Sequence, residues 1–170
     1  MGRKAALGGI LTAVSLIFLY FAFYLPSMKL TMYFLTGIIP GLVLVEMGVR
    51  QAWMLYGATS MLSFIMLGNV VNTIPYILIF GLYPIIKFYI EKTRRLIIQI
   101  PLKLAFFNIA IVLAYVICTK LFALNIATAL PIGWIIIGIQ PAYLLYDYIF
   151  TRVIFYYCDR VRIKWRKDLS

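Results

Sequence analysis

Residues 5–24 read AALGGILTAVSLIFLYFAFY, twenty consecutive residues without a charge. A bilayer core about 30 Å thick is crossed by about 20 apolar residues of α-helix, so this segment alone is long enough to span a membrane. Further apolar runs follow, and most charged residues lie in the gaps between them. These runs cover residues 30–47, 51–71, 73–90, 104–122 and 129–151. Because the six runs take up most of a 170-residue chain, we predict an all-α, polytopic integral membrane protein with six transmembrane helices in one domain, residues 1–170.

Composition supports this prediction and excludes other classes of protein. The chain is 65% hydrophobic and only 12% charged, against about 25% charged residues in a soluble domain. The apolar runs are unbroken, whereas strands of a transmembrane barrel alternate apolar and polar residues. The net charge of +11 would suggest a nucleic-acid partner in a soluble protein. Here the basic residues cluster in a few gaps and the tail, so membrane topology accounts for them and we expect no nucleic-acid partner.

The basic residues fall in alternate gaps between the apolar runs. Lys29 and Lys120 lie on one side of the predicted topology, and the other fourteen of the sixteen basic residues lie on the opposite side. Short cytoplasmic loops of membrane proteins are enriched in Lys and Arg. We therefore predict that both termini are cytoplasmic, with a short basic tail over residues 159–170. The expected location is the cell membrane as a multi-pass protein, most consistent with a bacterial plasma membrane.

Two segments need separate interpretation. Arg3 and Lys4 before an apolar run are typical of a signal peptide, but the run is too long and no small-x-small cleavage site precedes Pro26. We therefore expect a retained first helix. Residues 96–102 are apolar but too short to span a membrane, so we predict an interfacial stretch on the cytoplasmic face that leads into the fifth helix.

The ionisable residues argue against an enzyme. The chain has no histidine, and its acidic residues are Glu46, Glu91, Asp147, Asp159 and Asp168. A metal site needs several converging His, Cys, Asp or Glu ligands, and a hydrolase usually needs a base beside its nucleophile. We therefore predict a protein that is not an enzyme, with no catalytic residue, no metal and no cofactor.

Charged residues near the helix ends are expected to form local pairs. Glu46 with Arg50 and Lys87 with Glu91 are spaced i, i+4, which places each pair on one face of a helix. Asp147 lies about one turn inside the cytoplasmic end of the last helix. It is expected either to pair with a base such as Arg152 or Lys87, or to serve as a coupling or partner-docking charge.

Polar and aromatic residues at the outer ends of the helices form a candidate ligand site. Amides and hydroxyls supply hydrogen bonds, aromatic rings stack on a planar ligand, and a lysine attracts an anion. The candidate ligand-binding residues are Lys29, Asn72, Tyr76, Tyr115, Trp134 and Gln140. The alternative is a membrane-interface belt, because Tyr and Trp are enriched at both interfaces and short turns favour Asn.

Small residues recur at helical spacing in the first two predicted helices. Ala5, Gly9 and Ala13 are spaced i, i+4, i+8, and Gly37 and Gly41 repeat the spacing. Such a face lets another helix approach closely. A face of small residues serves either packing inside the protein or docking of a partner. For Ala5, Gly9 and Ala13, docking of a partner is the more specific hypothesis.

The chain resembles the substrate-binding S components of energy-coupling factor (ECF) vitamin transporters. The resemblance rests on the chain length, the six predicted helices, the cytoplasmic termini and the basic start that runs into Ala5-x-x-x-Gly9-x-x-x-Ala13. Members of this family dock a transmembrane coupling subunit through an alanine-x-x-x-alanine face of the first helix, and here Gly9 replaces one alanine. The resemblance implies capture of a vitamin-like small molecule from outside. It also implies a coupling subunit and an ATPase pair in trans, since the chain has no Walker motif.

Two alternatives stay open at this point. A small non-catalytic scaffold, regulatory or assembly protein would use the basic residues 160–167 to hold anionic membrane lipid or a cytoplasmic partner. A channel or proton-coupled carrier is less consistent with the sequence, because proton relays need ionisable groups at mid-membrane depth and the chain has very few.

Overall fold

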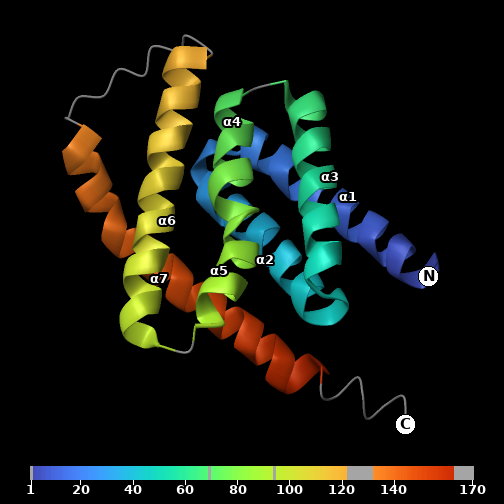
Figure 1. The fold of residues 1–170 in the computed structure, drawn as a ribbon. Helices are drawn as coiled ribbons and strands as arrows, with labels where there is room; N and C mark the ends of the chain where they lie inside the picture. The colour runs from blue at the N-terminus through green and yellow to red at the C-terminus, as the bar shows by residue number, and fades with distance from the viewer. Residues whose placement is uncertain (1, 69, 94, 122–131, 163–170) are drawn as a thin grey trace. The chain divides into compact units, whose positions relative to one another are not determined.

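The computed structural model describes residues 2–68, 70–93, 95–121 and 132–162, and they are helical apart from short connections (Figure 1). The α-helices are α1 (Gly2–Tyr24), α2 (Lys29–Met47), α3 (Val49–Leu67), α4 (Val70–Pro75), α5 (Tyr83–Glu91), α6 (Leu96–Val116) and α7 (Ile132–Tyr156). A 3₁₀ turn, η1 (Pro26–Met28), precedes α2. Three segments are π-helical: η2 (Tyr76–Phe80), η3 (Ile117–Leu121) and η4 (Tyr157–Arg162). The all-α prediction is confirmed.

Four helical segments are long and apolar enough to cross a membrane. They are Ala6–Tyr24, Pro26–Met47, Asn72–Glu91 and Ile97–Lys120. The third segment runs through α4, η2 and α5 and contains Pro75. We call α4, η2 and α5 together the α4–α5 rod. These four candidate spans indicate a multi-pass membrane protein. The chain divides into two compact units, Met1–Ala127 and Thr128–Ser170.

The beginning of α6 differs from the sequence-based prediction. Residues 96–102 are not a separate interfacial stretch, because they form the first turns of α6 and Pro101 lies inside that helix. Proline removes one backbone hydrogen bond from a helix. Transmembrane helices tolerate such a loss when neighbouring groups satisfy the freed carbonyl. The helix therefore begins after Arg95, whose backbone is extended (φ −109°, ψ 107°).

The second helix, α2, forms the centre of the first unit. It packs against α1, α3, η2 and α5, and α6 packs against η2 and α5. Figure 1 shows α3 and α4 side by side. The residues of α2 that are buried recur along much of its length, and they include small ones that allow close approach of its neighbours. They are Tyr33, Thr36, Gly37, Ile39, Pro40, Gly41 and Val43.

The turn between α2 and α3 depends on Gly48. Its backbone has φ +93° and ψ 174°, which is favourable only for glycine, and its N–H bonds the Leu44 carbonyl at 3.1 Å. Gly48 thus ends α2 between Glu46 and Arg50. The prediction that these two residues share one helix face is wrong, because the sequence spacing assumed an uninterrupted helix.

The order of spans yields a direct topology test. Ser27 precedes α2 and Thr93 follows α5, and both are exposed. Three predicted crossings separate them, so Ser27→Cys and Thr93→Cys should react with an impermeant maleimide from opposite sides of the membrane. The background should lack Cys118 and Cys158, which are both free thiols. Labelling of both positions from one side would show that α2, α3 and the α4–α5 rod do not all cross.

Candidate functional site

A cavity of about 500 Å³ lies between α1, α2 and α3. Its lining comes from the N-terminal half of α1, from the C-terminal part of α2 and from α3. The lining residues are Gly8, Gly9, Thr12, Ala13 and Leu16 of α1, Val43 and Met47 of α2, and Gln51, Met54, Leu55, Ala58 and Leu62 of α3. We call this feature the α1–α3 groove. Two of the three predicted docking residues, Gly9 and Ala13, line it, and the side chain of Ala5 lies outside the described part of the chain.

The small residues of α1 face open space. Gly9 and Ala13 are exposed, and a Cβ atom added to Gly9 would have no neighbour within 4 Å. By contrast, Gly37 and Gly41 are buried in α2. The two small-residue patterns therefore have different surroundings: the pattern in α2 packs inside the first unit, and the pattern in α1 borders the α1–α3 groove.

The surface of the α1–α3 groove is mainly apolar. Among the described lining residues, only Thr12 has a hydroxyl, and its Oγ1 donates a hydrogen bond to the Gly8 carbonyl at 2.9 Å. That bond within α1 occupies the hydroxyl hydrogen. Gln51 contributes the one amide side chain, at the α3 wall. A groove of this chemistry suits a transmembrane helix better than a polar solute, which needs several convergent hydrogen-bonding groups.

Asn72 and Tyr76, of the predicted ligand site, lie one turn apart in α4 and η2. The Tyr33 hydroxyl donates a hydrogen bond to the Asn72 carbonyl, and Tyr76 is fully buried against Leu19 and Ala22 in a cluster that also contains Tyr33. Among the described residues, the buried Tyr76 hydroxyl has no hydrogen-bond partner. In this structure Tyr76 is a core residue, and neither it nor Asn72 lines the α1–α3 groove.

The other four predicted ligand residues lie in several different parts of the chain. Lys29 begins α2 and Tyr115 lies in α6, and both are half-buried. Gln140 belongs to the second unit, and the Trp134 side chain lies outside the described part of the chain. The convergence of these residues on an outward-facing pocket therefore stays a prediction.

The sequence analysis missed the role of Gly81. The Gly81 N–H donates to the Tyr76 carbonyl, five residues earlier, at 2.7 Å, which is the hydrogen bond of a π-helical turn. A Cβ atom at Gly81 would lie 2.8 Å from Cζ of Tyr76 and 3.0 Å from Cδ2 of Tyr56. The Tyr56 hydroxyl in turn donates to the Ile77 carbonyl at 2.8 Å. A glycine five residues after Tyr76 was the available sequence signal, but glycine is common in membrane helices.

Substitution of Gly81 tests this packing. We expect Gly81→Ala to destabilise the protein by roughly 1–3 kcal/mol, because the added methyl group overlaps two aromatic rings. The matched control is Gly57→Ala in α3, where an added Cβ has no neighbour within 4 Å; it should have little effect or stabilise by up to about 1 kcal/mol. Thermal unfolding of the detergent-solubilised protein measures both. Equal melting temperatures for the two variants would contradict the close approach at Gly81.

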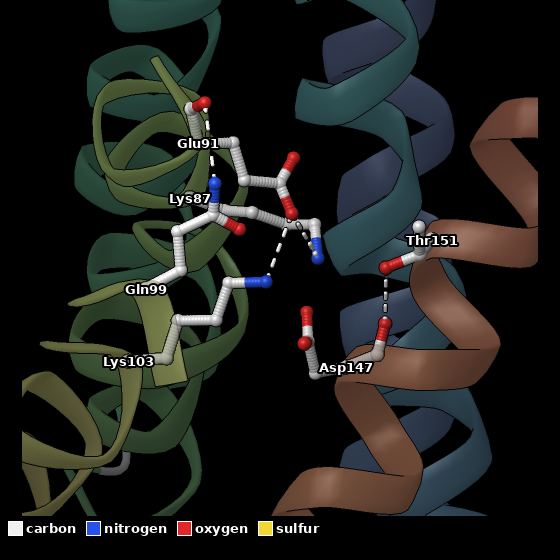
Figure 2. A network of polar contacts seen from close by, with 6 residues as sticks. All are labelled: Lys87, Glu91, Gln99, Lys103, Asp147 and Thr151. Atoms are coloured by element: carbon white, nitrogen blue, oxygen red, sulfur yellow. Dashed lines mark hydrogen bonds and ion pairs between the residues drawn. The ribbon is translucent and has the colours of Figure 1, made fainter. Parts of the chain in front are cut away.

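An ion-pair network joins α5 to α6 (Figure 2). Glu91 Oε1 lies 3.0 Å from Lys87 Nζ and 2.8 Å from Lys103 Nζ. Gln99 Nε2 also donates to the Glu91 carbonyl at 3.5 Å. The predicted Lys87–Glu91 pair is confirmed. Lys103 is a third member that sequence spacing could not reveal, because it lies twelve residues from Glu91 and reaches it only when α6 folds back against α5.

Asp147 belongs to the second unit. The Thr151 hydroxyl donates to the Asp147 backbone carbonyl at 2.6 Å (Figure 2). Arg152 contacts Tyr148: its Nε donates to the tyrosine hydroxyl at 3.1 Å, and its guanidinium carbon lies 5.2 Å from the ring centroid. Arg152 thus contacts Tyr148, four residues earlier on its own helix. The expectation that Asp147 pairs with a base such as Arg152 or Lys87, or serves as a coupling or docking charge, stays a prediction.

Within the described ranges, no group of three His, Cys, Asp or Glu residues lies close enough to hold a metal ion. Comparison of the chain with models of known protein families, with curated proteins and with solved structures finds no significant match.

Proposed function

We propose that the protein is the membrane-embedded substrate-binding subunit of an ECF-type importer. In this proposal six helices cross the membrane, both termini are cytoplasmic, and a vitamin-like micronutrient is captured from outside. A transmembrane coupling subunit and an ATPase pair, supplied in trans, complete the transporter. The candidate spans and the one-sided distribution of basic residues support the topology.

The observation that carries the proposal is the α1–α3 groove. Helices in lipid associate through close backbone approach, which needs small residues at the contact. Gly9 and Ala13 supply such residues on an exposed face, and Ala58 supplies a small residue on the opposite wall. The groove lies in the half of α1 that follows Arg3 and Lys4, which the proposed topology puts near the cytoplasm. A helix of a coupling subunit would therefore bind on the side where its ATPases work.

The second candidate function is a non-catalytic scaffold or assembly protein. The burial of Tyr76 in the core favours it, because a ligand that contacts this hydroxyl would have to displace Leu19, Ala22 or Tyr33. A scaffold would use the same groove for docking without capturing a small molecule. The two functions therefore share the interface and differ only in the ligand.

Retention of a small molecule separates the two functions. Native mass spectrometry of the purified protein should detect a bound compound of vitamin size, and denaturing extraction followed by mass spectrometry should identify it. The scaffold function predicts assembly with partner subunits but no bound small molecule. The absence of any ligand from protein purified out of cells grown in rich medium, together with normal assembly, would contradict the importer proposal and favour the scaffold.

Enlarging a residue in the α1–α3 groove tests the docking interface. Gly9→Leu and Ala58→Leu, on opposite walls, should each lower co-purification of partner subunits by at least about ten-fold, because a large side chain prevents close helix approach. Gly57→Leu is the matched control, since Gly57 lies in α3 but does not line the groove, and an added Cβ there meets no neighbour. All three variants should stay folded by thermal unfolding. Normal co-purification with both groove variants would reject the interface.

A further inference from the structure

The turn between α5 and α6 lies between two candidate membrane spans. One candidate span ends at Glu91 and the next begins at Ile97. A chain that crosses the membrane at both spans has Lys92, Thr93 and Arg95 at the level of the lipid headgroups, whichever side of the membrane they face. Lys92, Thr93 and Arg95 in this turn are exposed. This position follows from the spans alone and does not depend on the proposed transport function.

The one carboxylate near this turn is already neutralised within the described part of the first unit. Glu91 contacts Lys87 and Lys103 (Figure 2), whose side chains are only 6% and 9% exposed. Lys92 and Arg95 form no ion pair or side-chain hydrogen bond among the described residues. Lys92 and Arg95 are therefore two exposed positive charges three residues apart, next to a partly buried ionic network that holds α5 and α6 together.

An exposed apolar surface adjoins the basic turn. On the α6 side, Ile97 is 88% exposed, and Ile98 and Ile100 are also exposed; on the α5 side, Phe88 and Tyr89 are exposed. Aromatic residues at this depth are typical of membrane interfaces. Basic groups beside apolar side chains match the two parts of a phospholipid, an anionic phosphate and its acyl chains.

We propose that the α5–α6 turn binds an anionic diacyl phospholipid. Lys92 and Arg95 contact the phosphate, and Ile97 contacts the acyl chains. The ion pairs of Glu91 with Lys87 and Lys103 are positioning contacts: they hold the two helix ends together and keep the carboxylate from repelling the phosphate. Charge complementarity selects a phosphatidylglycerol-like lipid over a zwitterionic one.

Lipid titration with native mass spectrometry tests this site. We expect the full-length protein in detergent to bind phosphatidylglycerol more tightly than phosphatidylcholine, and the preference to fall as salt rises. The double variant Lys92→Gln, Arg95→Gln should weaken phosphatidylglycerol binding by about ten- to thirty-fold. The matched control is Arg50→Gln, Lys120→Gln, which removes two exposed basic residues outside the turn and should leave the tight binding unchanged.

Three results would overturn the proposal. The first is equal affinity of the unmodified protein for the two lipids, a measurement that needs no variant. The second is displacement of phosphatidylglycerol by millimolar inorganic phosphate, which would identify a site for free anions. The third is an equal loss of binding in the turn variant and the control variant, which would indicate a diffuse charge effect. Ile97→Gln should weaken lipid binding without changing the melting temperature, since this side chain is almost fully exposed.

Discussion

Within the hydrocarbon of a bilayer, every backbone N–H and C=O group needs a hydrogen-bond partner from the protein itself. This constraint explains the most irregular part of the first unit, the rod formed by α4, η2 and α5. Pro75 has no N–H to donate, and the π-helical turn that follows shifts the backbone pairing. Tyrosine hydroxyls from two other helices bond carbonyls on either side of this point, Tyr33 to Asn72 and Tyr56 to Ile77. The hydrogen bonds that satisfy these two carbonyls therefore also connect α2 and α3 to the rod.

The same rod explains the position of the aromatic core. Gly81 leaves room for the Tyr76 ring, which in turn packs with residues of α1 and α2. A residue expected to reach a ligand is therefore part of the packing that holds three helices together. In a helix that crosses a membrane, a polar side chain serves structure as readily as function, because both need its hydrogen bonds inside the protein.

Small residues and basic residues each occur in two settings in the first unit, buried or paired inside it and exposed on its surface. Gly37 and Gly41 are buried where other helices pack against α2, whereas Gly9 and Ala13 line the open α1–α3 groove. Likewise Lys87 and Lys103 form ion pairs with Glu91, whereas Lys92 and Arg95 stay exposed. In each case the residues used internally hold the helices in place, and other residues of the same type stay exposed.

The sequence by itself determined the all-α class and most of the helix positions, because apolar runs of about 20 residues have one stable solution in a bilayer. It also determined the Lys87–Glu91 pair, which needs only helical spacing. Only the tertiary structure decided that Lys103 joins that pair, that Gly48 separates Glu46 from Arg50, and that residues 96–102 belong to α6. It also decided which small-residue pattern is buried and which borders the groove. The physical reason is that spacing along a helix specifies which residues share a face, whereas the neighbour that covers this face is set by packing between helices distant in sequence.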